Sequence, residues 1–126
     1  PVLGFSVLGG HFGEGIDLPG KRLLGAVIVG VGLPQLCLER NLIQKYFSEQ
    51  YMDGYAYAYI FPGLNRVLQA AGRVIRTATD RGIVLLIDER FARPPYDEIM
   101  PEHWNIRYAS QEELSVLEII EEFWES

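Results

Sequence analysis

The sequence has a single cysteine and no long apolar run, and both shortages exclude classes of protein. Cys37 alone allows neither an internal disulfide bond nor a zinc site built on paired cysteines. No apolar run approaches the roughly 20 residues that a bilayer-spanning helix needs. No basic stretch followed by an apolar one has the pattern of a signal peptide. We therefore expect a cytoplasmic protein with no membrane partner.

The chain is also short of positive charge, and its net charge of -6 comes from its last residues. Six of the 17 carboxylates lie in residues 110–126, which contain no lysine or arginine, and this leaves 11 acids against 11 bases in residues 1–109. A large basic face that holds nucleic acid is therefore not expected. The hydrophobic content of 48% is enough for the core of one globular domain.

Four apolar runs have the length of strands. Three of them do not alternate with polar residues, which is typical of strands buried on both faces of a parallel sheet. The fourth, AYAYIF, alternates and is also interpreted as a strand. The runs lie at residues 4–8, 25–31, 56–61 and 83–87, and two stretches with helical spacing lie at residues 36–50 and 63–79. This alternation predicts an α/β fold with a mainly parallel sheet of about four strands flanked by helices.

The end of the chain predicts an acidic helix. Ser110 followed by Glu113 has the spacing of a capping box, so we expect a helix over residues 111–125. Its apolar stripe consists of Val116, Ile119, Ile120 and Phe123. The preceding segment, residues 91–108, has three prolines and no steady period, which predicts irregular structure.

Two arginines stand close together in QAAGRVIRTATDRG, residues 69–82. If the helix of residues 63–79 continues through them, then Gln69, Gly72, Arg73 and Arg76 share one face, and the apolar face opposite packs on the sheet. The polar face has two interpretations. It is either a solvated surface with weak salt bridges, or an anion site, because guanidinium groups are planar bidentate donors that suit phosphate.

The longer stretch QAAGRVIRTATDRGIVLLIDER resembles motif VI, Q-x-x-G-R-x-x-R, of superfamily 2 helicases. In the DinG and XPD branch of that family an aspartate and a glycine follow, and the next strand ends in Asp-x-Arg. Every one of these positions is filled here, by Gln69, Gly72, Arg73, Arg76, Asp80, Gly82, Asp88 and Arg90. The stretch GGHFGEGIDLPG, residues 9–20, is similar to motif V of the same branch, and the resemblance extends to about Trp104.

The resemblance implies that residues 1–126 are the C-terminal part of the second of two RecA-like, P-loop NTPase helicase domains, which close together over ATP. It implies three catalytic residues: Arg76 as the arginine finger, Arg73 holding the phosphates or linking to motif V, and Gln69 orienting the nucleotide or the attacking water. The nucleotide-binding set that it implies consists of Gly15, Asp17, Gly72, Arg73 and Arg76.

Motif V implies contacts with single-stranded DNA. Glycines allow a backbone to approach a phosphate closely. The expected DNA-binding residues are Gly9, Gly10, His11, Glu14, Lys21 and Arg22. Taken alone, the glycine-rich stretch is also consistent with a tight turn, His11 with an exposed loop side chain, and Lys21 and Arg22 with plain surface. Four tyrosines, at positions 51, 55, 57 and 59, are expected to pack on a sheet face rather than to stack on bases.

The sequence contains neither G-x-x-x-x-G-K-[ST] nor a D-E-A-H box, so it has no means of binding ATP and Mg²⁺ by itself. We expect both to be held mainly by the missing first motor domain, which is then a partner within the same chain. An iron–sulphur cluster would also belong to the missing part, because it needs four cysteines. No metal site is expected in residues 1–126.

The predicted function is thus that of an ATP-dependent DNA helicase in repair or replication. Two alternatives stay open. One is a non-catalytic module that binds nucleic acid or docks a protein through its acidic helix. A less favoured reading is a two-metal nuclease built from Glu14, Asp17, Asp80, Asp88 and Glu89.

Overall fold

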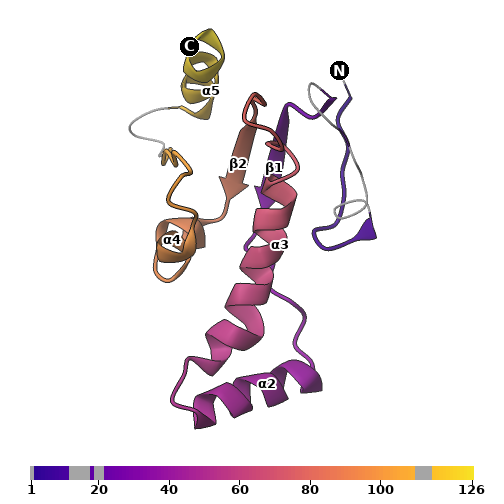
Figure 1. The fold of residues 1–126 in the computed structure, drawn as a ribbon, viewed down its shortest axis with the longest axis vertical. Coiled ribbons are helices and arrows are strands. Elements are labelled where there is room, and N and C mark those ends of the chain that lie inside the picture. The colour runs from indigo at the N-terminus through magenta and orange to yellow at the C-terminus, as the bar shows by residue number, and fades with distance from the viewer. Residues whose placement is uncertain (1, 12–17, 19–21, 110–114) are drawn as a thin grey trace.

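The computed structural model describes residues 2–11, 18, 22–109 and 115–126. Within them the chain alternates strands with helices (Figure 1). In chain order the elements are β1 (Gly25–Val29), α2 (Leu38–Glu49), the π-helical η2 (Ala56–Ile60), α3 (Phe61–Ala71), β2 (Ile83–Ile87), the 3₁₀ helix η3 (Glu89–Ala92), α4 (Tyr96–Ile99) and α5 (Val116–Glu125). No helix in this part of the chain is long and apolar enough to cross a membrane.

β1 and β2 pair in parallel, with Gly25 opposite Ile83 and Val29 opposite Ile87. Parallel neighbours need a long crossover, and here α2, η2 and α3 provide it (Figure 1). The predicted α/β class is confirmed. The expected number of strands is wrong for the described residues, which contain two. Residues 4–8 form no strand, because their backbone pairs with neither β1 nor β2.

The run AYAYIF, predicted as a strand, is helical. The Asp53 carboxylate accepts a hydrogen bond from the Ala56 amide at 3.0 Å, which caps the start of η2, and η2 runs directly into α3. Tyr57 and Tyr59 therefore pack between helices rather than on a sheet, whereas Tyr51 and Tyr55 are exposed. Tyr57 stacks on Phe47 of α2 with 4.2 Å between the ring centres, and the Tyr59 hydroxyl hydrogen bonds to Asn41 at 2.7 Å.

The core lies between α3 and one face of the sheet. α3 contributes Leu64, Val67 and Ala71, which are buried against Ile28 of β1. The segment after β2 completes the core with Phe91, Tyr96 and Met100. Apart from η3 and the four-residue α4, residues 91–108 have no helix or strand, as predicted.

α5 lies over the opposite face of the sheet. Side chains alternate along a strand, so Val27 and Leu85 point away from the core. They line an open apolar groove of about 330 Å³ together with Ile120 and Trp124 of α5. α5 covers this face incompletely, because Val27 stays 62% exposed.

The start of α5 differs from the prediction. Ser115 and Glu118 form its capping box: the Ser115 hydroxyl accepts from the Glu118 amide at 3.2 Å, and the Glu118 carboxylate accepts from the Ser115 amide at 2.9 Å. The predicted box of Ser110 and Glu113 lies outside the described residues. The predicted end of the helix, at residue 125, is confirmed.

Candidate nucleotide and nucleic-acid site

α3 ends before the two arginines. The backbone amides of Gly72, Arg73 and Val74 bond to the last carbonyls of the helix, at 2.8, 3.3 and 3.0 Å, and the chain then leaves the helical path. The prediction that Gln69, Gly72, Arg73 and Arg76 share one helix face is therefore wrong. Gln69 is on α3 and exposed, whereas Arg73 and Arg76 lie in the segment of residues 72–82, here called the arginine loop.

Asp80 organises the backbone of the arginine loop after the helix has ended. One oxygen of its carboxylate accepts hydrogen bonds from the backbone amides of Arg76 and Thr77, both at 2.9 Å. An aspartate that binds nearby amides offers the backbone an alternative to the helix. The bonds from the Arg76 amide and then the Thr77 amide lower the pKa of the Asp80 carboxyl. The carboxylate thus holds the main chain of Arg76 in place.

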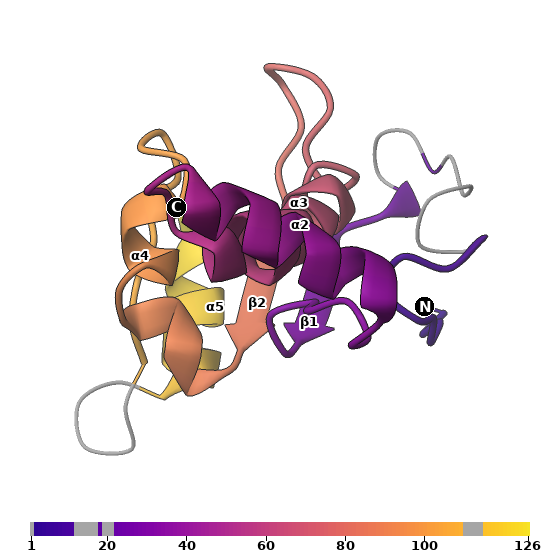
Figure 2. The ribbon, with the colours of Figure 1, turned by 90° about the horizontal axis from the view of Figure 1, so that it is seen from below.

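The base of the arginine loop is closed by Val74 and Gly82. Val74 is buried at 3% exposure, and a Cβ on Gly82 would collide with the Val74 Cγ1 atom and come within 3.1 Å of the Leu24 carbonyl oxygen. Only glycine lets the two legs of the loop approach this closely. Figure 2 shows the loop projecting beyond the end of α3.

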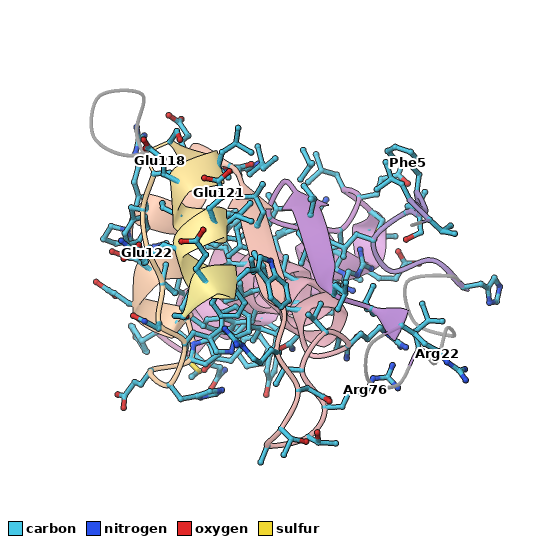
Figure 3. The ribbon with its side chains drawn as sticks, turned by 90° about the horizontal axis from the view of Figure 1, so that it is seen from above. Phe5, Arg22, Arg76, Glu118, Glu121 and Glu122 are labelled. Atoms are coloured by element: carbon cyan, nitrogen blue, oxygen red, sulfur yellow. The ribbon has the colours of Figure 1, made fainter. Side chains whose placement is uncertain are left out.

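The two guanidinium groups differ in environment. Arg73 is half-buried and Arg76 is exposed, and the Arg76 Nε donates to the Arg73 carbonyl oxygen at 3.2 Å. Figure 3 shows Arg76 and Arg22 on the same side of the molecule, away from the acidic side chains of α5. Neighbouring guanidinium groups on a projecting loop suit an anion with several oxygens, such as a phosphate.

The glycines expected to approach DNA form a tight turn. Gly9 has a φ of +81°, a conformation that glycine adopts at no steric cost, and the Gly10 amide donates to the Val7 carbonyl oxygen at 2.9 Å. His11 is exposed. Glu14, Gly15, Asp17 and Lys21, which complete the predicted sites, lie outside the described residues.

One side chain near this turn was missed by the sequence analysis. Arg66 of α3 lies against Gly9, where a Cβ would be 3.2 Å from the Arg66 Nε. It therefore joins the glycine turn to the helix that leads into the arginine loop. Its position three residues before Gln69 on the same helix was the signal for it, because residues at this spacing share a face.

The Asp-x-Arg sequence after β2 has a structural role. Both oxygens of Asp88 bind the Arg90 guanidinium, at 2.9 and 2.7 Å, and one also accepts from the Arg90 amide at 2.9 Å. The side-chain bond from Arg90 lowers the pKa of Asp88 to about 2, against an ordinary value of 3.8. The pair fixes the turn into η3.

The carboxylates considered for a two-metal site are not brought together where the structure describes them. Asp80 precedes β2 and Asp88 follows it, so the strand separates them. Glu89 is paired with Arg93 at 3.1 Å. In the described part of the chain no group of three or more His, Cys, Asp or Glu side chains has the arrangement to hold a metal ion.

Known proteins resemble this chain over most of its length. The model of the helicase C-terminal domain family matches residues 2–107. A probable ATP-dependent helicase of Methanocaldococcus jannaschii is 34% identical over 92 residues, which cover 66% of this chain and 14% of that protein. The ATP-dependent DNA helicase chl-1 of Caenorhabditis elegans is 33% identical, over 71% of this chain and 11% of its own.

The helicase subunit XPD of the general transcription and DNA repair factor IIH of Arabidopsis thaliana is also 33% identical, over 71% of this chain and 12% of its own. The alignments thus span between a tenth and a seventh of these three relatives. α5 begins beyond residue 107, outside the segment that the family model matches.

The family match and these relatives agree with the motifs at residues 9–20 and 69–90. The chain belongs to the helicase C-terminal domain family, in the DinG and XPD-like branch of superfamily 2.

Proposed function

We propose that this chain is part of the second motor domain of an ATP-dependent DNA helicase and that its arginine loop acts on the phosphates of ATP. The observation that carries the proposal is the support of Arg76. Its side chain is exposed on a projecting loop, while its main chain is fixed by Asp80 and by the contact of Val74 with Gly82. A site that stabilises charge in a transition state needs such a positioned donor.

In this proposal the two arginines and Gln69 have separate roles. Arg76 is the arginine finger and meets the charge that develops on the transferred phosphoryl group. Arg73, half-buried at the foot of the loop, holds the phosphates or links to the glycine turn. Gln69, exposed one turn earlier on α3, orients the nucleotide or the attacking water.

The first motor domain is the partner that this arrangement requires. The sequence has no phosphate-binding P-loop, so ATP binds mainly to that domain, as does Mg²⁺, which neutralises phosphate charge. Gly15, Asp17 and Gly72 complete the nucleotide contacts from this side. An iron–sulphur cluster, if the helicase has one, lies in the part that supplies four cysteines.

The glycine turn is proposed to couple ATP turnover to single-stranded DNA. Gly9 and Gly10 allow a phosphate to approach the main chain, and Arg22 lies on the same side as Arg76 (Figure 3). His11, Glu14 and Lys21 complete the proposed DNA contacts. We place the helicase in DNA repair or replication in the cytoplasm, and expect the isolated chain to bind DNA weakly and in a salt-sensitive manner.

The test is Arg76→Ala in the intact helicase. We expect ATP turnover to fall by roughly 10³-fold, as when other arginine fingers are lost, while nucleotide binding survives because the first domain holds the ground state. Arg76→Lys restores little, since lysine lacks the planar fork. If Arg76→Ala leaves turnover within about twofold, as expected for an exposed ion pair, the assignment is wrong.

Two further assays separate the alternatives. The isolated chain should not hydrolyse ATP, and turnover by it would contradict the two-domain arrangement. Cleavage of DNA with Mg²⁺ and without ATP would support a nuclease. If the intact protein shows neither DNA-stimulated ATP hydrolysis nor DNA cleavage, the interpretation that remains is a non-catalytic interaction module.

A further inference from the structure

Arg81 joins the arginine loop to α5. Its Nη2 donates to the Phe123 carbonyl oxygen at 2.6 Å, and its guanidinium lies over the rings of Phe123 and Trp124, 5.0 and 5.8 Å from their centres. A cation is favoured at the carbonyl end of a helix and over aromatic faces. The last turn of α5 is therefore bound to the residue that follows Asp80.

The other attachments of α5 are weak. Arg107 pairs with Glu122 at 2.6 Å, but these side chains are 44% and 64% exposed, and such pairs contribute little. None of the side chains of α5 is fully buried. The groove beside Ile120 and Trp124 leaves part of its apolar stripe without close contact. Arg81 is thus a main attachment of the last turn of α5.

Arg81 is also close in the chain to the residue that fixes Arg76. Asp80, its neighbour, holds the amides of Arg76 and Thr77, so a displacement of Arg81 moves Asp80 and with it the main chain of Arg76. Figure 1 shows α5 beside the start of β2, where the arginine loop ends. A continuous series of contacts therefore leads from Phe123 to Arg76.

We propose that Arg81 is a positioning residue, through which α5 holds the arginine loop where Arg76 reaches the nucleotide. This proposal rests on the function proposed above for Arg76. It assigns a role to α5, which lies outside the segment that the helicase family model matches. In this proposal the apolar stripe of α5 packs against this domain and does not dock a separate protein.

The test compares two ways of breaking the same link in the intact helicase. Arg81→Met keeps an unbranched apolar stem and removes the guanidinium with its charge and hydrogen bond. Glu121→Pro disrupts α5 from an exposed position, because proline removes a helical hydrogen bond and clashes with the preceding turn. Glu121→Ala is the matched control, since alanine keeps the helix.

We expect Arg81→Met and Glu121→Pro each to speed the amide hydrogen exchange of residues 74–80. Each should lower kcat by roughly three- to tenfold, the size expected for one exposed hydrogen bond, with the KM for ATP within about twofold because the first domain binds the nucleotide. The double variant should be no worse than either single one, since both break one link. Glu121→Ala should leave both measurements unchanged, and Arg81→Lys should retain part of kcat.

The proposal would be overturned by unchanged exchange of residues 74–80 in Arg81→Met, or by effects that multiply in the double variant. Faster exchange with unchanged kcat would also overturn it, because the link would then exist without positioning Arg76. Arg76→Ala in the same assay separates the two proposals. If Arg76→Ala does not lower turnover, the arginine-finger function fails, and the positioning role fails with it. If Arg76→Ala does and Arg81→Met does not, only the role of Arg81 is wrong.

Discussion

β2 is flanked by two pairs of aspartate and arginine that are used differently. Before the strand, Asp80 binds the backbone amides of Arg76 and Thr77. After the strand, Asp88 binds the guanidinium of Arg90 with both of its oxygens. The first carboxylate fixes a main chain and sets where its arginine is presented, whereas the second fixes the side chain of a partly exposed arginine. Residue types alone therefore do not separate an arginine whose main chain is held from one whose side chain is held.

Asp80→Ala should have the largest effect on turnover among the variants that leave Arg76 in place. Without the carboxylate the backbone of Arg76 is no longer held, and misplacement of a catalytic group by about 1 Å can cost roughly 10²-fold. We expect kcat at saturating ATP to fall by roughly 10- to 100-fold. Asp80→Asn keeps an oxygen that accepts the amide bonds and should lose much less. Equal losses in the two variants would show that the charge of Asp80, not its amide bonds, matters.

Gly82→Ala should lower the stability of the protein, because it disturbs the base of the arginine loop just before β2. Its Cβ requires Val74 to move, and overpacking of a buried contact costs about 1–3 kcal/mol of unfolding free energy. Gly4→Ala is the control, because a Cβ there meets no atom within 4 Å. Chemical denaturation of both variants measures the difference. A Gly82→Ala protein as stable as Gly4→Ala would contradict the close contact at the base of the arginine loop.

Asp88→Asn should lower the stability of the protein and leave ATP turnover nearly unchanged. It removes a charge-assisted bond on a partly exposed pair, so we expect a loss of about 1 kcal/mol in unfolding free energy. The kcat for ATP should remain within about twofold, because both groups of the pair bind each other. A large fall in kcat with unchanged stability would contradict the structural role assigned to the pair of Asp88 and Arg90.

The unfolding free energy should depend on pH through the same pair, Asp88 and Arg90. Since the folded pKa of Asp88 is about 2 and its ordinary value is 3.8, the contribution of the pair is present above pH 3.8 and is lost as the pH falls toward 2. Thermal unfolding between pH 5 and pH 2 measures this loss. Asp88→Asn should reduce the slope in that range, and an unchanged slope would show that Asp88 does not contribute.

Two of the four predicted strands are confirmed. Residues 83–87 form β2 as predicted, and β1 lies within the predicted run of residues 25–31, because continuous apolar runs in a parallel sheet leave few alternatives. Residues 56–61 were misread because alternation of alanine and tyrosine over six residues does not distinguish a strand from a helix. Asp53, three residues before Ala56, was the missed helix-capping signal.

The geometry of the candidate site was not predictable from the sequence. The motif placed Arg73, Arg76 and Asp80 in one segment, but helical periodicity carried the helix past its end at Ala71. Beyond that end Asp80 holds a loop through contacts with backbone amides, which a pattern of side chains does not reveal. The contact of Arg66 with Gly9 depends on how α3 packs against a distant turn, so it needed the three-dimensional structure.

The most direct measurement compares the binding of ADP with that of ADP and aluminium fluoride, a mimic of the transferred phosphoryl group, to intact helicases carrying Arg76→Ala or Arg90→Ala. If the arginine loop stabilises the transition state, Arg76→Ala should leave ADP affinity within about twofold and weaken binding of the mimic by roughly 10³-fold. Arg90→Ala should change neither affinity, because its guanidinium is bound to Asp88. Equal losses of ADP and mimic affinity in Arg76→Ala, or a selective loss of the mimic in Arg90→Ala, would contradict the account.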